Sequence, residues 1–175
     1  VLYEGKDVYR NLRWWRKKIG VVPQETAFYE ELSAEENLLL WAGLYGLDRK
    51  RAKKRAWQLL ESLGLASRGK DKVAKYSGGM KRRLNLAIGL VHEPEFLLLD
   101  EPTVGIDVQT KIYIREFLRE LAGSGVSMIY TTHQLEEAEQ LCDRIAIMDE
   151  GQILAQGTLE ELLALLGEKE TIIIK

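Results

Sequence analysis

The order of strand-like and helix-like segments predicts an α/β fold with a mostly parallel sheet and an inserted helical subdomain. Between Phe96 and Met148, short apolar runs alternate with amphipathic stretches, and this alternation is typical of parallel sheets. The run from Phe96 to Leu99 is apolar throughout, as expected of a strand that is buried on both faces. Three consecutive helical patterns between Gln24 and Pro94 interrupt the alternation and predict the inserted subdomain.

Composition limits the classes of protein to which the chain can belong. Its 175 residues are 46% hydrophobic and 30% charged, which predicts one globular domain. A formal net charge of -2 gives no global field for polyanions, so we expect no nucleic acid as partner. The single Cys142 excludes a disulfide framework and favours a reducing cytoplasm. The longest apolar stretch, Leu38 to Leu47, is about half of the ~20 residues that span a bilayer, which predicts no direct membrane insertion.

The first segments read as two strands joined by a basic stretch. Val1 to Val8 alternates apolar and polar residues, and Ile19 to Val22 is a β-branched run that ends at a proline. The stretch between them has arginines and lysines around Trp14 and Trp15. This pattern is either a nucleic-acid patch or a solvated helix face with buried rings, and the net charge favours the second interpretation.

Capping residues and breakers mark the three helices of the expected subdomain. Ser33 and Glu36 form a capping box before the first helix. The second helix runs from about Asp48 to Gly64, and its basic residues between positions 49 and 55 lie on the polar face, where solvation explains them. The third begins near Ser77 and runs to Glu93, before a proline.

The second half of the chain predicts strands and helices in turn. They are a helix through Ile114 and Leu121, a strand at Val126 to Thr131, a helix at Leu135 to Leu141, strands at Arg144 to Met148 and Gln152 to Gln156, and a last helix capped by Thr158 and Glu161.

Two adjacent carboxylates follow the most apolar strand. Asp100 and Glu101 emerge where the strand ends, and ligands of open α/β folds bind at the carboxyl edge of the sheet. The first carboxylate suits a hydrated Mg²⁺, and the second suits a general base for an attacking water. Taken alone, the pair is also consistent with two solvated acids at a strand end.

Two further groups point to the same chemistry. Ser77, Gly78 and Gly79 stand at the start of a helix, where backbone N–H groups and the helix dipole attract phosphate. Such glycines cost roughly 1 kcal/mol each in a helix, which calls for an explanation beyond an ordinary serine cap. The strand ending at Thr131 delivers His133 to the same edge, where a histidine can donate a hydrogen bond to a terminal phosphate. For His92 we expect a structural or solvated role.

In this order the motifs resemble those of the nucleotide-binding domain of ATP-binding cassette (ABC) proteins, which have a P-loop NTPase fold. The motifs are Val22-Pro23-Gln24-Glu25, Tyr76-Ser77-Gly78-Gly79-Met80, Leu97-Leu98-Leu99-Asp100-Glu101-Pro102-Thr103, Gly105-Ile106-Asp107 and Thr131-Thr132-His133. The resemblance covers nearly the whole chain. Tyr76 and Met80 depart from the usual Leu-Ser-Gly-Gly-Gln signature, and with the following Lys81-Arg82-Arg83 they resemble the multidrug and antibiotic exporter branch.

The resemblance implies a role for each matching residue. Gln24 would be the Q-loop glutamine, a ligand of Mg²⁺ and sensor of the membrane partner, and Ser77, Gly78 and Gly79 would belong to the signature motif. Asp100 would be the metal-binding Walker B aspartate, and Glu101 the catalytic base beside it. Asp107 would be the D-loop aspartate, and His133 the catalytic switch histidine. ATP and Mg²⁺ are therefore the expected cofactors.

The sequence contains no phosphate loop of the form G-x-x-x-x-G-K-S/T. The nearest match, Gly64 to Asp71, follows a helix instead of a strand and ends in an acid where the metal-binding hydroxyl should stand. By the resemblance, the true loop precedes Val1, so we expect a cassette truncated at its N-terminus and inactive alone. Residues 158–175 are expected to hold the last helix and the start of a C-terminal extension.

The expected organisation is thus a partial ABC ATPase domain over residues 1–175. Residues 24–94 would include the helical subdomain and signature, and residues 95–157 the core from Walker B to the switch histidine. The resemblance implies an ATPase subunit at the cytoplasmic face of the cell membrane. Its partners would be a second such domain, forming a dimer, and a transmembrane permease that docks near Gln24 and the aromatics from Phe28 to Tyr45. The alternatives are a non-transport ABC ATPase and a nonhydrolysing assembly fragment.

Overall fold

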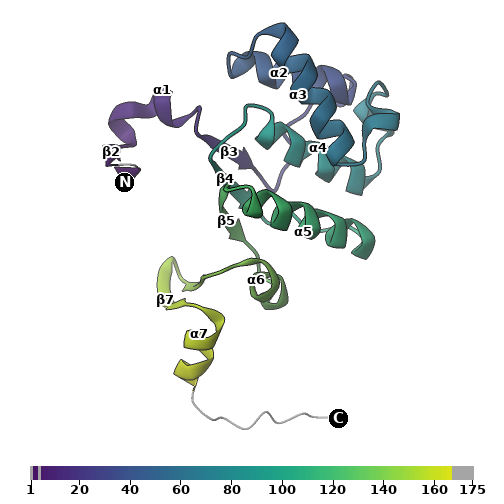
Figure 1. The fold of residues 1–175 in the computed structure, drawn as a ribbon. Helices are drawn as coiled ribbons and strands as arrows, with labels where there is room; N and C mark the ends of the chain where they lie inside the picture. The colour runs from purple at the N-terminus through teal and green to yellow at the C-terminus, as the bar shows by residue number, and fades with distance from the viewer. Residues whose placement is uncertain (1, 4, 167–175) are drawn as a thin grey trace. The chain divides into compact units, whose positions relative to one another are not determined.

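The computed structural model describes residues 2–3 and 5–166 and divides the chain into two compact units, Val1–Thr131 and Thr132–Lys175 (Figure 1). The expected strand at Ile172 to Ile174 lies outside the described residues.

A parallel sheet forms the centre of the first unit. Its strands are β3 (Ile19–Val22), β4 (Phe96–Asp100) and β5 (Ser127–Thr131), in the order β3-β4-β5. Val22 lies opposite Leu99, and Leu99 lies opposite Tyr130, so the carboxyl ends of all three strands meet at one edge. The α/β class and the parallel pairing of these three strands are confirmed.

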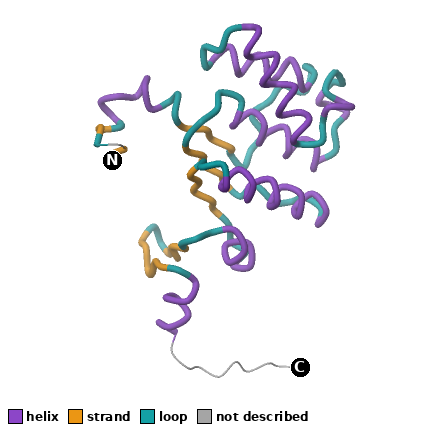
Figure 2. The backbone as a smooth tube through the Cα atoms, viewed as in Figure 1, coloured by secondary structure: helices purple, strands orange, loops and turns teal. Residues whose placement is uncertain are grey.

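Helices α2 (Ala34–Leu44), α3 (Arg49–Ser62) and α4 (Gly78–Leu90) cluster on one side of this sheet (Figure 2). The predicted caps are present, since Ser33 and Glu36 form a complete capping box and Asp48 accepts from the first amides of α3. Helix α4 ends earlier than predicted. Glu93 adopts a positive φ of 58°, and the residue before a proline disfavours the helical region. Short 3-10 turns at Ala66–Arg68 and Val73–Lys75 join α3 to α4.

Helix α4 lies directly against β3, because glycines remove the side chains between them. A Cβ on Gly20 would lie 2.1 Å from the carbonyl oxygen of Gly89, and one on Gly89 would lie 2.6 Å from Val22 Cγ2. Leucines of α4, α3 and β4 then build one continuous core around this contact. The first turns of α4 reach the carboxyl edge of the sheet through Arg82, whose Nη2 donates to the Asp100 carbonyl.

Helix α5 (Val108–Gly123) completes the first unit and adds Ile114 and Leu118 to the same core. The Tyr113 hydroxyl donates to the carbonyl of Ser62 at 2.7 Å, which links α5 to the end of α3. The helix is longer toward its N-terminus than the apolar pattern alone indicated, because Asp107 caps it.

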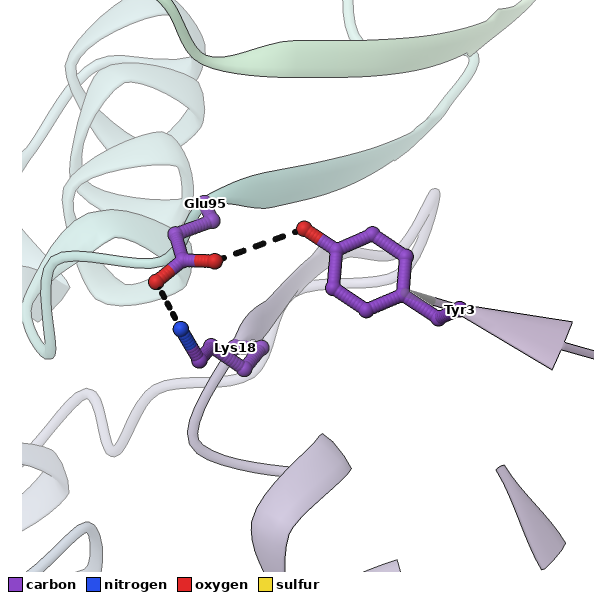
Figure 3. Close-up of polar contacts among 3 residues, drawn as sticks. All are labelled: Tyr3, Lys18 and Glu95. Atoms are coloured by element: carbon purple, nitrogen blue, oxygen red, sulfur yellow. Dashed lines mark hydrogen bonds and ion pairs between the residues drawn. The ribbon is translucent and has the colours of Figure 1, made fainter. Parts of the chain in front are cut away.

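The amino-terminal segment packs at the amino ends of the sheet's strands. It comprises β1 (Leu2–Tyr3) and β2 (Lys6–Asp7), an antiparallel pair, then a 3-10 turn (Tyr9–Asn11) and α1 (Leu12–Trp15). The Tyr3 hydroxyl donates to Glu95 Oε2 at 3.4 Å, and Lys18 pairs with the same carboxylate (Figure 3). Trp14 and Trp15 are half-buried, so their rings are covered less fully than the prediction of buried rings implied. Both rings pack against the Tyr3 ring at tilted angles, and Lys6 Nζ lies 4.5 Å from the centre of the Trp14 ring.

The second unit contains α6 (Leu135–Leu141), β6 (Ile145–Asp149), β7 (Gln152–Gly157) and α7 (Leu159–Leu166). The two strands form an antiparallel hairpin through Glu150 and Gly151, both at positive φ. The alternation of strands and helices did not predict this pairing. A tight two-residue turn places β7 directly beside β6, with no helix between the two strands. The cap of α7 is as predicted, with Thr158 and Glu161 bonded reciprocally.

Candidate functional site

The carboxyl ends of β3 and β4 bring three of the predicted site residues together. The Gln24 side chain Nε2 donates to Glu101 Oε2 at 3.3 Å, although the two residues are 77 positions apart. Asp100 is the last residue of β4, and its carboxylate is exposed, whereas Glu101 is half-buried. An amide and two carboxylates therefore share one edge of the sheet, where α/β proteins bind ligands.

Thr131, the last residue of β5, fixes the two acids in place. Its Oγ1 donates to Asp100 Oδ1 at 2.7 Å, and the Glu101 amide donates to the Thr131 carbonyl at 3.2 Å. Glu101 has a φ of 43°, which is unfavourable for a residue with a side chain and is tolerated when neighbouring groups hold it. The strained backbone and its bonds turn Glu101 away from the continuing strand direction.

Arg82, on α4, is the most connected side chain near this edge, and sequence reasoning did not assign it a role. It is 5% exposed, and all three of its nitrogens donate to backbone carbonyls. The acceptors lie at the end of β4 and in the loops that follow β3 and β4, and they are the carbonyl oxygens of Pro23, Gln24, Asp100, Glu101 and Pro102. Burial lowers the pKa of the guanidinium, and Tyr130, Asp100 and Glu101 oppose this effect.

Asn85 continues the same face of α4 one turn later. Its Oδ1 accepts from the Ala27 amide at 3.0 Å, and its Nδ2 donates to the Pro23 carbonyl at 3.0 Å. Like Arg82 it is almost fully buried. One sequence signal could have identified these two residues. They are polar, lie three positions apart, and stand among leucines and glycines on a helix that is otherwise largely buried.

The start of α4 has the predicted serine and glycines, but the glycines differ in their surroundings. Ser77 caps the helix by accepting from the Met80 amide at 3.2 Å. A Cβ on Gly78 would have no atom within 4 Å, whereas one on Gly79 would lie 2.5 Å from Thr110 Oγ1. Gly78 therefore leaves the helix start open to a ligand, and Gly79 lets α4 approach α5 within the chain.

Asp107 caps α5 next to this contact. Its Oδ1 accepts from the Thr110 amide at 2.9 Å, and its Oδ2 accepts from the Thr110 hydroxyl at 2.7 Å. The hydrogen bonds from Thr110, amide first, hold the pKa of Asp107 below its ordinary value. The residue is exposed and remains a charged group beside the glycines of α4.

His133 belongs to the second unit. Its position beside the two acids therefore stays a prediction. It is exposed, and it follows Thr132, whose hydroxyl donates to Glu137 Oε2 at 3.1 Å and accepts from the Gln134 amide. His92, by contrast, has the expected structural role. Its ring is buried, stacks on Tyr45 and contacts the Ile19 carbonyl at 2.9 Å.

The structure also bears on the segment that most nearly matches a phosphate loop. The rejected phosphate-loop match is not a strand-to-helix loop, since it contains a 3-10 turn closed by an Arg68–Asp71 ion pair.

Of the aromatics expected to be exposed for docking, only Tyr29 is largely exposed, at 55%. Phe28 and Tyr45 pack against the core, and Trp41 does so while donating to the Ala27 carbonyl. The predicted aromatic surface is therefore reduced.

The side-chain oxygens at the carboxyl edge of the sheet suit a Mg²⁺ ion that is coordinated mainly by a bound ligand. Among the residues that the structure describes, no group of three or more histidine, cysteine or acidic side chains could hold a metal. Asp100 offers an exposed carboxylate and Gln24 an exposed amide. Mg²⁺ usually takes one or two protein oxygens and completes its shell with water and substrate phosphates. This donor set therefore suits a metal that arrives with a phosphate ligand.

A parallel sheet with an amide and two carboxylates at its carboxyl edge, beside a helix that opens with glycines, defines a nucleotide-binding α/β protein. The family model described as ABC transporter matches residues 1–104. The chain belongs to the ABC transporter family.

Curated relatives support this assignment. The chain is 51% identical over 152 residues to a linearmycin resistance ATP-binding protein of Bacillus subtilis, which covers 87% of this chain and 49% of that protein. It is 45% identical over 163 residues to a daunorubicin resistance ATP-binding protein of Streptomyces coeruleorubidus, with 93% and 52% covered. A Nod factor export ATP-binding protein of a Rhizobium species is 42% identical over 159 residues, with 91% and 52% covered. The chain thus spans about half the length of these relatives.

A solved structure described as the ATP-binding subunit of an ABC transporter has the same fold. The TM-score is 0.80 at 30% identity, and the match covers 93% of this chain and 68% of the other. No helix among the described residues is both long enough and apolar enough to cross a membrane.

Proposed function

We propose that this chain is part of an ATP-hydrolysing subunit that powers a membrane exporter. The observation that carries the proposal is the contact between Gln24 and Glu101 beside Asp100, at the edge of the parallel sheet. Of the relatives, two are named for resistance to linearmycin or daunorubicin and one for Nod factor export, which supports an exporter of small organic compounds.

Glu101 would act as the general base in the proposed reaction. Its carboxylate accepts the proton of the water that attacks the terminal phosphate, and the Gln24 amide, 3.3 Å away, orients that carboxylate. Asp100, held by Thr131, and Gln24 would hold Mg²⁺, which neutralises charge on the phosphates when bound. His133 would donate a hydrogen bond to the terminal phosphate, as the motif order implies.

Ser77 and Gly78 would contact ATP held by a second copy of the domain. The exposed start of α4 offers backbone amides, and a Cβ on Gly78 would meet no atom within 4 Å, so this side of the helix start is open to a phosphate. Asp107, charged and exposed beside these residues, would line the same interface. The remaining partner would be a transmembrane permease that contacts the segment after Gln24, placing the subunit at the cytoplasmic face of the membrane.

Replacement of Glu101 by glutamine tests the catalytic assignment. In the protein as its gene encodes it, Glu101→Gln should lower ATP hydrolysis by at least about 10²-fold, since it removes the base and keeps the side chain's shape. ATP binding should persist, because Asp100 is unchanged. Phosphate release and nucleotide titration measure the two effects, with Glu95→Gln at the other end of β4 as control. Hydrolysis within a few fold of the wild type would refute the assignment.

Gly78→Asp tests the contact with the second copy. The added carboxylate would face open space in the isolated subunit, so thermal stability should stay within a few degrees of the wild type. ATP-dependent dimerisation, measured by light scattering, should be lost because the carboxylate repels the phosphate. Dimerisation at wild-type ATP concentrations would exclude the helix start from the interface.

A further inference from the structure

Arg82 connects the loop that carries Gln24 with the end of β4 and the loop after it, which carry Asp100 and Glu101. The loops follow β3 and β4, and their carbonyl oxygens point at one guanidinium from α4. Arginine has five N–H donors in a planar fork. The structure gives Arg82 five carbonyl acceptors, which matches that number.

The division of these donors between the loops is specific. Nη1 donates to Pro23 and Gln24 at 3.0 and 2.9 Å, and Nη2 donates to Asp100 at 3.0 Å and also to Glu101. One planar group therefore spans both loops and sets their separation. Nε adds a third point at the Pro102 carbonyl, at 2.6 Å.

The charge of Arg82 is not neutralised by an ion pair within 4 Å in the part of the chain that the structure describes. A buried charge without such a pair is costly and is retained only when its hydrogen bonds are well formed. Here the backbone accepts those bonds, so the side chains of Asp100 and Glu101 are not used to hold Arg82. This arrangement suits a site whose carboxylates must bind other groups.

We infer that Arg82 is a positioning residue that fixes the Gln24 loop and the Asp100–Glu101 loop relative to each other and to the start of α4. Its role rests on the proposed function, because the geometry it sets is that of Glu101 and Gln24. Movement of the Gln24 loop, or of α4, would then displace Glu101 through the same guanidinium. Asn85 contributes to one loop only, through Pro23 and Ala27.

The test compares Arg82→Lys with Arg82→Met in the protein as its gene encodes it. Lysine keeps the charge but has its three donors at one point, so it cannot span both loops. For Arg82→Lys we expect kcat for ATP hydrolysis to fall between about tenfold and about 100-fold, while KM for ATP changes less than about twofold. Arg82→Met removes every donor and should have the larger effect.

Hydrogen exchange provides a readout that does not depend on hydrolysis. In Arg82→Lys, the amides of residues 24–27 and those of residues 101, 103 and 104 should both exchange faster, while those within β3 and β4 keep their protection. Arg55→Met is the matched control, because Arg55 also donates to a buried backbone carbonyl, that of Leu90, away from both loops. It should leave exchange in both loops and kcat unchanged.

Three outcomes would overturn the inference. They are unchanged exchange in both loops of Arg82→Lys, faster exchange in one loop only, and a lower melting temperature with kcat per folded molecule preserved. Absence of hydrolysis in the wild type would refute the proposed function instead, and the exchange experiment would still decide whether Arg82 couples the loops.

Discussion

The two ends of the same three-stranded sheet are held in different ways. At the carboxyl end, the buried Arg82 binds loop carbonyls, and the acidic side chains carry the proposed chemistry. At the amino end, the acidic side chain is itself the link, since Glu95 pairs with Lys18 and accepts from Tyr3 (Figure 3). The difference shows how backbone carbonyls can hold a buried arginine at a site without using the site's carboxylates as its ion-pair partners.

The largest expected effect separates the two ends by activity. Asp100→Asn should lower Mg²⁺-dependent ATP hydrolysis by about 100-fold, because it removes the charged metal ligand and keeps the bond to Thr131 within reach. Glu95→Gln, the matched change at the amino end, should leave hydrolysis within about twofold, since exposed ion pairs contribute little. Phosphate release at varied Mg²⁺ measures both. Equal losses in the two variants would abolish the distinction.

The contact between α4 and β3 should be the most sensitive for stability. Gly20→Ala places a Cβ 2.1 Å from the Gly89 carbonyl oxygen and should lower the free energy of unfolding by about 3 kcal/mol. Gly43→Ala on α2 is the control, because its Cβ meets open space and should raise that free energy by about 0.5 kcal/mol. Urea unfolding of both variants checks the prediction, which fails if Gly20→Ala is as stable as the wild type.

Neighbouring glycines at the carboxyl end should differ in the same way on a smaller scale. Gly79→Ala brings a Cβ within 2.5 Å of Thr110 Oγ1, so we expect a loss of about 1 to 2 kcal/mol. Gly78→Ala should cause no loss, since its Cβ meets nothing within 4 Å. Chemical denaturation distinguishes them. A loss in Gly78→Ala equal to that in Gly79→Ala would place both glycines in intrachain packing.

The smallest expected effect is a pH dependence at the amino end. Burial lowers the pKa of His92 from its ordinary value of 6.5, the Ile19 carbonyl opposes the shift, and Arg55 adds to it. The folded state thus binds this proton less readily than the unfolded state, so its contribution is present above pH 6.5 and is lost as the pH falls below 6.5.

His92→Gln should remove that dependence. Between pH 6.5 and about 5.5, the wild type should lose up to about 1 kcal/mol more stability than the variant. The carboxylates with lowered pKa values, Glu36, Glu93 and Asp107, titrate below this window and leave the comparison intact. Parallel stability profiles for the two proteins would show that His92 stays neutral in both states or titrates alike.

Much of the fold was predictable because its signals are local. Ser33 with Glu36, and Thr158 with Glu161, satisfy helix amides within three residues, so the sequence alone identifies the start of each helix. The end of α4 was predicted less well, because a positive φ at Glu93 stops the helix before the proline. The antiparallel partner of β6 was missed because alternation describes the order of elements and not their pairing.

The residues of the candidate site also divide into those that a local pattern predicts and those that it does not. Sequence alone determined the family, the order of the motifs, and that Gln24, Asp100 and Glu101 would follow strands, since strand ends and short motifs are read over a few residues. Only the tertiary structure decided that Arg82, among three consecutive basic residues, is the buried one, and that Gly79 packs on Thr110 while Gly78 stays open. The physical reason is distance along the chain. Arg82 meets carbonyls 18 to 59 positions away, and such contacts depend on how α4 packs against β3 and β4, which no local pattern encodes.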